Sequence, residues 1–397
     1  SELTFGPEYI IPKPFDPRVL VWETVAVAEA AIKSGVAKKK IDLDEYREQL
    51  LQRLDESREV MRKFQVLARR DPKRIVYPEG THPKIIWAAS EVASEGIARP
   101  VLLGDEKVIR ERFEELNHEH EGIEVVEPKR SPALDGYIKA YYRLRQRKGV
   151  TRTQATGEMS KDLTSGAMMV QQGDADGMVA GVSVNYPDVL RPALRAIGPR
   201  RDGRLVGGMY MMLHEHQLYC LADCAVNENP DAADLAEIAL MAATELDRMQ
   251  IMPRIAMLSF ANFGSVRGPA TDKVTEAVRL IKEQRPHLVV DGPMQADVAL
   301  DVEMMREHFP FSELRVRPNL LVFPNLDAAN ISLKMLERFT TAHIMGPIMM
   351  GMAKPVHLVV RGSDVESIVS LSAIACLDAQ KVATKERRVA EALNYST

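Results

Sequence analysis

Arg361 has the position and the chemistry of an anion-binding residue. It follows a short apolar segment that ends at Val360, and it stands beside Gly362, just ahead of a stretch with helical spacing. A guanidinium at the end of a strand and close to a helix N-terminus can offer parallel N–H donors to a phosphate. An ion pair on the surface is the alternative for a lone Arg-Gly pair.

Two further arginines have the right character to complete such a site. Residues 141–151, YYRLRQRKGVT, concentrate positive charge around Arg145 at the end of a predicted helix. Arg191 lies between two leucines in LRPALR, where a buried guanidinium would need a partner. With Arg361, these side chains would neutralise a phosphoryl group or part of a nucleotide. A solvated helix face is the alternative for each.

Other chemically useful residues stand where predicted strands end. Residues 320–323, LLVF, predict a buried parallel strand closed by Pro324-Asn325, and residues 254–260 predict another, followed by the loop 261–265. Loops at the carboxyl ends of parallel strands usually hold ligands. A turn predicted at 346–351, GPIMMG, would bring backbone amides and flexible methionines to the same neighbourhood. Gly181, at the end of DADGMVAG, would let a loop approach a ligand closely.

The sequence gives little support for a metal or dinucleotide site. The pair Asp174 and Asp176 favours a turn, since nothing nearby completes an oxygen cage. The triplets 118–120 and 214–216, both His-Glu-His, lack the spacing that places two histidines on one helical face. Neither GxGxxG nor GxxxxGK followed by Ser or Thr occurs. The three cysteines, Cys220, Cys224 and Cys376, lie in apolar settings and indicate buried, reduced thiols.

These residues must be positioned by alternating strands and helices, which begin near Arg74. Residues 75–77 and 100–104 predict strands, and residues 84–95 predict the helix between them. Asp327 to Phe339 has helical spacing as well. Such βαβ repeats imply an α/β fold with a mainly parallel sheet and helices on both faces.

A helical linker is predicted ahead of this region. Asp16 can cap a helix that starts at Pro17 and ends at Gly35. Asp42 can cap a second, longer helix with apolar positions that include Leu50, Leu51, Leu54 and Met61. Together the two helices resemble a docking arm.

Composition places the chain among ordinary α/β proteins. With 397 residues, 46% of them apolar, it can bury large cores and its length favours two domains. A net charge of -4 gives no electrostatic reason to expect nucleic acid or an anionic membrane as a partner. The sequence shows neither a membrane-spanning run nor the layout of a signal peptide, so a cytoplasmic location is expected.

Several segments together resemble the phosphate acetyltransferase family. They are GMVAGVSVNYPDVLRPALRAIG, DCAVNENPDAADLAEIAL, RIAMLSF, FPNLDAANISLK and GPIMMGMAKPVHLVVRG, and the resemblance runs from about Arg74 to Gln380. The opening stretch, FGPEYIIPKPFDPRVLVWETVAVAEAAIKSGVA, resembles instead the carboxyl end of a bacterial malic enzyme. In this order the two resemblances imply the later part of a longer chain, in which a phosphotransacetylase-like region follows malic domains.

The resemblance implies ligand-binding roles for a set of residues. By this comparison Arg145 and Arg191 hold the phosphate-bearing ligand, and small hydroxyl residues near the acetyl and phosphoryl groups persist as Ser259 and Ser265. Ala261 and Phe263 replace polar family positions, which narrows that pocket. The full implied set is Arg145, Arg191, Ser259, Ser265, Asn325, Asn330 and Arg361.

Two family positions that carry the chemistry are changed. Active members read Leu-Ser-Arg-Gly, with an Asp six residues after the Arg, whereas this chain has Val360 at the Ser position and Ser367 at the Asp position. A thiol with a pKa of about 8.5 is only slightly ionised at neutral pH, so acetyl transfer to coenzyme A needs a base that Ser367 cannot supply. Val360 cannot donate the hydrogen bond that a Ser would give to the developing oxyanion, and losing one such donor costs on the order of 3 kcal/mol of transition-state stabilisation. Asp364 is a possible substitute base, but a capping box formed by Ser363 and Glu366 is favoured.

The expected organisation is a linker at 1–70, a first domain at 71–152 and 311–397, and a second domain at 153–310, with ligand in the cleft between them. The resemblance implies a catalytically silent region that senses acetyl-coenzyme A. It would regulate malic domains that decarboxylate malate to pyruvate with NADP and Mg or Mn. An active phosphate acetyltransferase and an oligomerisation module are the alternatives. A homodimer or larger homo-oligomer is expected, with weak support from the apolar run at 368–377.

Overall fold

The structure, a computed structural model, describes residues 17–37, 39, 41–43, 46–47, 50, 61–116, 120–200, 203, 205–215 and 217–394, with only the backbone at 17–21 and 383–394. The chain divides into two compact units, residues 1–63 and 64–397. Within the described ranges, no helix has both the length and the apolar character needed to cross a membrane.

The first unit contains α1, Pro17–Lys33, as the sequence predicts. Pro17 occupies its first position, and Gly35 follows its end with a φ of 76° that favours glycine. Val25 and Leu50 are buried together, with Leu43 and Tyr46 packed against them. The predicted cap Asp16 and the helix positions Leu51 and Leu54 lie outside the described residues.

The second unit begins within a helix at residues 61–68 and contains a parallel five-stranded sheet in the order β11-β4-β1-β2-β3. Its strands are β1 (Arg74–Tyr77), β2 (Arg99–Leu103), β3 (Glu124–Val126), β4 (Gly177–Ala180) and β11 (Val356–Leu358). These strands are almost continuously apolar, because helices cover both faces of the sheet.

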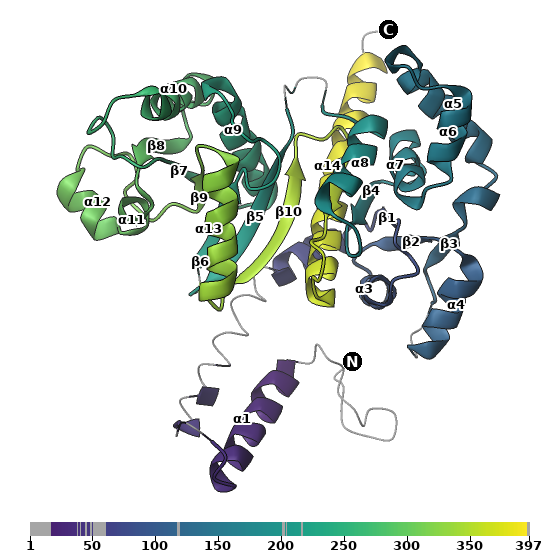
Figure 1. Cartoon of the computed structure of the whole chain (residues 1–397), viewed down its shortest axis with the longest axis horizontal. Coiled ribbons are helices and arrows are strands. Elements are labelled where there is room, and N and C mark those ends of the chain that lie inside the picture. The colour runs from purple at the N-terminus through teal and green to yellow at the C-terminus, as the bar shows by residue number, and fades with distance from the viewer. Residues whose placement is uncertain are drawn as a thin grey trace. The chain divides into compact units, whose positions relative to one another are not determined.

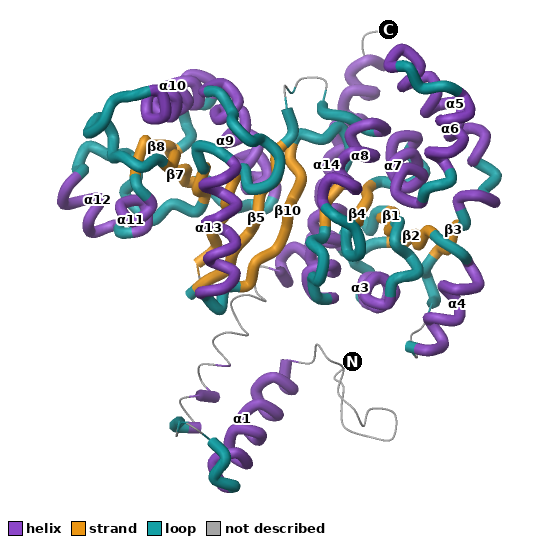
Figure 2. Tube along the Cα trace, in the orientation of Figure 1, coloured by secondary structure: helices purple, strands orange, loops and turns teal. Residues whose placement is uncertain are grey.

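Helices on either side of this sheet complete the layer (Figure 2). The α-helices are α3 (Pro83–Ser94), α4 (Glu106–Glu115), α5 (Leu134–Arg145), α6 (Arg152–Met159), α7 (Asp162–Gln172), α8 (Tyr186–Ala196) and α14 (Val365–Asn394), and two 3-10 turns are η1 (Pro128–Arg130) and η2 (Gln146–Lys148). The helices α3 and α4 lie on one side of the strands, and α5 to α7 on the other. The predicted α/β fold is therefore confirmed, with substantial helical content.

The second unit also contains a mixed six-stranded sheet in the order β10-β5-β6-β9-β7-β8 (Figure 1). Its strands are β5 (Gly207–His214), β6 (Gln217–Ala222), β7 (Arg254–Leu258), β8 (Val289–Met294), β9 (Leu320–Val322) and β10 (His343–Met350). The strands from β6 to β8 are parallel, whereas β5 is antiparallel to both β6 and β10. The associated helices are α9 (Ala232–Arg248), α10 (Pro269–Gln284), α11 (Ala296–Leu300), α12 (Val302–His308) and α13 (Leu326–Phe339).

The turn predicted at 346–351 is wrong, because most of this segment belongs to β10. The strand pairs with β5, and the register shifts between Met345 and Ile348. Proline lacks an N–H group, so a strand usually accepts it only at an edge or a bulge. Pro347 meets both conditions, since β10 is an edge strand and Pro347 lies within the register shift. Tertiary pairing therefore overrides the local turn signal.

The chain passes between the two sheets at two adjacent segments. Arg200 N donates to Gly351 O at 2.8 Å, and Ala353 N donates to Gly198 O at 3.0 Å. These crossings differ from the expected domain boundaries at 152 and 311, since β4 belongs to the five-stranded sheet and β9 and β10 to the six-stranded one. The second crossing joins β10 directly to β11 with no helix between them, so it departs from the βαβ pattern expected from the sequence.

The apolar run at 368–377 is core and not a surface for self-association. It forms part of α14, which contacts β4 and β11 of one sheet and β10 of the other. Ile368, Leu371 and Ile374 are each at most 1% exposed. The unusually continuous apolar character is explained by contacts on several sides of the helix.

Buried charges join α9, α14 and β11. Glu245 Oε1 accepts from Arg248 Nη1 at 2.6 Å, and Arg248 Nη1 also lies 3.6 Å from Asp378 Oδ1. Asp378 Oδ2 lies 3.1 Å from His357 Nε2, while His357 Nδ1 accepts from Met349 N. Lys381 Nζ donates to Arg248 O. Charged and polar groups from three elements thus meet in the interior, where Glu245 Oε2 and His357 Nε2 make no hydrogen bond to the described part of the chain.

Candidate functional site

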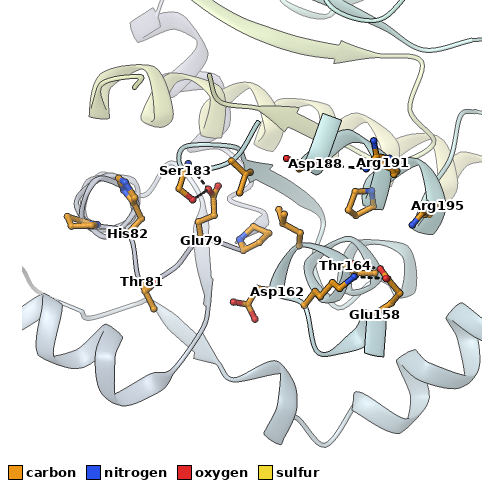
Figure 3. Close-up of a pocket in the computed structure, with 16 residues that line it drawn as sticks. Glu79, Thr81, His82, Glu158, Asp162, Thr164, Ser183, Asp188, Arg191 and Arg195 are labelled. Atoms are coloured by element: carbon orange, nitrogen blue, oxygen red, sulfur yellow. Dashed lines mark hydrogen bonds and ion pairs between the residues drawn. The ribbon is translucent and has the colours of Figure 1, made fainter. Parts of the chain in front are cut away.

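A cleft of about 770 Å³ opens at the carboxyl ends of β1 and β4 (Figure 3). The loops after these strands form part of its wall through Glu79 and Ser183, and α8 contributes Arg191 and Arg195. The first turn of α7 and the beginning of α3 complete the lining. Parallel strands place such loops at one edge of the sheet, where ligands usually bind.

Glu79 fixes the loop that follows β4. Its carboxylate accepts from Val182 N at 3.0 Å and from Ser183 N at 2.7 Å, and it also accepts from Gly181 N and the Ser183 hydroxyl. Gly181 has a φ of 125°, and a Cβ there would collide with Val359 O. The predicted close approach at Gly181 is therefore to the chain after β11. Sequence reasoning missed Glu79, which resembles an ordinary turn residue.

Two of the four acidic groups in the cleft are already engaged. Glu79 is held by the loop amides, and Glu158 Oε1 pairs with Lys161 Nζ at 2.6 Å. Burial raises the pKa of Asp162. Asp188 Oδ1 lies 4.0 Å from Arg191 Nη1, which is longer than a hydrogen bond.

The cations on α8 are less fully compensated. Arg191 is 59% exposed at its side chain, and its contact with Asp188 is the long one. Arg195 stands one helical turn further along and lines the same cleft, with no ion pair to any residue that the structure describes. Figure 3 shows both arginines on the same helix. This wall of the cleft can accept an anion with little displacement of existing pairs. Sequence reasoning did not single out Arg195, which follows an ordinary helical spacing.

Arg145 lies at the end of α5 and outside the lining of this cleft. Its Nε is buried and makes no hydrogen bond to the described part of the chain. Burial raises the pKa of Tyr141, and the charges of Arg195 and Arg145 both oppose that shift. The two arginines therefore share the electrostatic surroundings of Tyr141.

A second cavity, of about 450 Å³, brings together Val360 and Ser367, the two positions at which the resemblance to the family implies a change. Val360, Arg361 and Ser367 line it from one side of the fold, and Tyr210 and Lys334 line it from the other. Arg361 Nη2 donates to Ser183 O at 2.9 Å, so Ser183 links the cavity to the cleft that it also lines. Sequence reasoning missed Tyr210 and Lys334, which come from distant strands and helices.

The predicted capping box at Ser363 and Glu366 is wrong by one residue. Asp364 Oδ1 accepts from Ser367 N at 2.8 Å, so Asp364 itself caps α14. Carboxylates are good caps because they satisfy a free amide and complement the helix dipole. Lys84 Nζ donates to Ser363 O at 2.7 Å, which holds the same turn from the α3 side.

A third cavity, of about 650 Å³, lies at the carboxyl ends of β7 and β9 and is called the switch-point crevice below. It contains Ser259 and Asn325 from the expected ligand set. Asn330 and Ser265 do not line it: Asn330 Nδ2 donates to Cys224 O at 3.4 Å, and Ser265 is exposed. The structure therefore distributes the expected residues over several places.

The possible metal ligands do not gather. Within the described residues, no group of three or more His, Cys, Asp or Glu side chains is placed to hold a metal ion. His118, Glu119 and His216 lie outside these residues. Asp174 accepts from Tyr137 Oη and Asp176 accepts from Arg74 N, which fits the turn role predicted for this pair.

The cysteines are free and buried, as predicted. Burial raises the pKa of Cys220 to about 12 and that of Cys376 to about 11. Burial and the charge of Asp223 hold the pKa of Cys224 well above its ordinary value. These thiols are therefore poor nucleophiles at neutral pH.

The chain is similar to known proteins over most of its length. The family model described as phosphate acetyl/butaryl transferase matches residues 59–376. The NADP-dependent malic enzyme of Escherichia coli is 38% identical over 386 residues, which cover 96% of this chain and 51% of that protein. The phosphate acetyltransferase of Clostridium acetobutylicum is 37% identical over 321 residues, or 79% of this chain and 96% of that protein.

A solved structure gives the same result for the fold. The phosphotransacetylase from Streptococcus pyogenes superposes with a TM-score of 0.78 and 32% identity, over 82% of this chain and 99% of that one. The chain spans about half the length of the malic enzymes that it matches.

Proposed function

Because the chain belongs to the phosphate acetyl/butaryl transferase family, we propose that it binds acetyl-coenzyme A through the family's site without transferring the acetyl group. The bound thioester regulates malic domains of the same protein. Those domains would oxidise and decarboxylate malate to pyruvate with NADP and Mg or Mn, which bind outside this region. Self-association into a dimer or larger homo-oligomer is part of the proposal.

The main support is the composition of the cavity around Arg361. The positions that hold Ser and Asp in active members are Val360 and Ser367, and both line this cavity. Among its described lining residues the one carboxylate is Glu337, whose two oxygens pair with Lys334 Nζ at 3.0 and 2.9 Å. Asp364 is engaged by Ser367 N. The cavity thus holds cations but has no unpaired base for a thiol.

The neighbouring cleft suits the phosphate-bearing end of the ligand. Arg191 and Arg195 present guanidinium groups there, and Arg361 joins the cleft to the cavity through Ser183. Acetyl-coenzyme A carries phosphates at one end and a thioester at the other. We place its phosphates in the cleft and its thioester toward Val360.

Arg191→Ala and Arg361→Ala are each expected to weaken binding of acetyl-coenzyme A by about 2 kcal/mol, or roughly thirtyfold. The estimate stays at the low end of charge-assisted contacts because Arg191 is 59% exposed. Isothermal titration calorimetry of the chain measures the effect directly. Arg112→Ala removes a guanidinium that pairs with Glu115 on the surface of α4 and serves as the control. Unchanged affinity in both site variants would remove these arginines from the site.

Regulation is tested in the whole protein that contains the malic domains. We expect acetyl-coenzyme A to change malate-dependent NADP reduction by about 5- to 150-fold in rate or apparent malate affinity, the usual range of coupling between sites. Metabolic logic favours inhibition, because malic enzyme output feeds acetyl-coenzyme A. In Arg361→Ala the response should move to higher ligand concentration.

The same measurement separates the alternatives. A ligand that changes neither the rate nor the malate dependence in the parent protein would leave a structural or oligomerisation role. Turnover of acetyl phosphate and coenzyme A by the chain would indicate an active transferase. Reciprocity adds a check on binding: if acetyl-coenzyme A changes the equilibrium affinity for malate or NADP, that ligand must change the affinity for acetyl-coenzyme A by the same factor.

A further inference from the structure

The switch-point crevice has the location of a ligand site in its own right. From β7 the chain continues through α10 to β8, whereas from β9 it continues through α13 to β10. In the sheet order these connections run in opposite directions from two neighbouring strands. Ligands of open α/β sheets bind at the carboxyl ends of strands where the order reverses in this way.

Its lining combines apolar walls with one cation. Phe323 is buried and Phe260 is 63% exposed at the crevice, with Pro269 and Pro324 also in the lining. An exposed aromatic face of this kind is suited to stacking against a planar ring. The volume of about 650 Å³ falls within the usual range for small-molecule sites.

Lys273 supplies the positive charge. Its Nζ donates to Pro324 O at 2.9 Å, and no carboxylate among the described residues lies within ion-pair distance of it. Burial lowers the pKa of Lys273, and the charge of Asp231 opposes that shift. A partly desolvated ammonium without a carboxylate partner gains most from a bound anion.

Two amides are placed to read the edge of a ring. Asn325 Oδ1 accepts from Ala328 N at 2.9 Å in capping α13, which leaves its NH₂ group as a donor. Asn229 lines the crevice as well, and Ser259 adds a hydroxyl. The crevice shares no lining residue with the cleft or with the cavity around Arg361.

We propose that the switch-point crevice binds a purine nucleoside monophosphate, with the base against Phe260 and the phosphate on Lys273. This site is separate from the one proposed for acetyl-coenzyme A. It assigns Ser259 and Asn325 to the second ligand and leaves Arg191 and Arg361 to the first.

The test is calorimetric titration of the chain with AMP, with adenosine and inorganic phosphate as partial ligands. Lys273→Met and Phe260→Ala are each expected to weaken AMP binding about tenfold or more, the size of a lost stacking or charge-assisted contact. Lys282→Met on the same helix and Phe311→Ala at another exposed phenylalanine are matched controls, with unchanged binding expected. Adenosine should bind the parent less tightly than AMP but should lose little further affinity in Lys273→Met.

Competition distinguishes this site from the acetyl-coenzyme A site. AMP should bind with the same affinity in Arg361→Ala and in the presence of saturating acetyl-coenzyme A. Three results would each overturn the proposal: absence of AMP binding, AMP binding as tight in Lys273→Met and Phe260→Ala as in the parent, or displacement of AMP by acetyl-coenzyme A. The affinity for acetyl-coenzyme A alone reports on the proposed function, so the two can fail independently.

Discussion

Acetyl transfer between acetyl phosphate and coenzyme A is expected to stay at the uncatalysed background in this chain, and Val360→Ser with Ser367→Asp is expected to raise it. One oxyanion donor contributes about 10²- to 10³-fold to such a reaction, and a positioned base contributes about 10²- to 10⁴-fold. The double variant should therefore gain roughly four orders of magnitude or more over the parent. Release of free thiol or its consumption in a coupled assay measures the rate.

The geometry supports this expectation because both positions already line the cavity with Arg361. Position 367 lies in the first turn of α14, where an added carboxylate is favoured by the helix dipole. Val360→Ala with Ser367→Ala changes both sites without adding a donor or a base, so it should remain at background. This pair controls for altered packing.

Two outcomes would contradict catalytic silence. A robust rate in the parent that disappears in Asp364→Asn would show that Asp364 leaves its cap and acts as the base. A robust rate that survives this substitution would require another base in or near the cavity. In either case the regulatory proposal would give way to an active transferase.

Much of the fold could be predicted because its elements are coded locally. The strand at 320–323 and the helix up to Phe339 follow from an apolar run, a Pro-Asn exit and helical spacing, and both appear as β9 and α13. β10 was not predictable in this way. Its Gly-Pro signal is local, whereas the pairing with β5 that makes it a strand involves residues more than 100 positions away.

The site could be predicted residue by residue but not as an arrangement. Arg361 was singled out by its strand-end position, and the structure does place it beside a cavity. Its link to Ser183 depends on the packing of β11 against β4, which no spacing encodes. The division of Arg191, Arg361 and Asn325 among three cavities is likewise a result of tertiary structure.

Asp378→Ala is expected to lower the free energy of unfolding by about 3–5 kcal/mol, the cost of breaking a buried ion pair from one side. Asp378 is the group that both Arg248 and His357 approach, and His357 is fully buried. Since Met349 N donates to His357 Nδ1, the ring proton is assigned to Nε2, which would lose the carboxylate that faces it. Chemical denaturation measures the loss. Asp135→Ala, at an exposed position in the first turn of α5, should cost less than about 1 kcal/mol.

The pH dependence of stability tests the same cluster through Glu245. Burial and the nearby charge of Asp378 raise the pKa of Glu245 to about 8, although Arg248 opposes the shift. An unfolded chain releases this proton near pH 4.5. Between those values the folded chain binds more protons than the unfolded one, so Glu245 makes stability fall as pH rises from about 4.5 to about 8. Glu245→Gln stays uncharged and should remove this contribution.

Asp378→Ala should also lower the pKa of Glu245, because it removes the carboxylate whose charge helps to keep Glu245 protonated. The pH range over which Glu245 makes stability fall should therefore become narrower. The expected pattern is a less stable protein whose stability falls over a narrower range of pH. Equal denaturation midpoints for Asp378→Ala and Asp135→Ala would contradict a stabilising role for the cluster. An unchanged pH profile in Glu245→Gln would instead mean that Glu245 is already ionised in the folded protein. Its contact of 2.6 Å with Arg248 Nη1 would then be the ion pair that keeps it so.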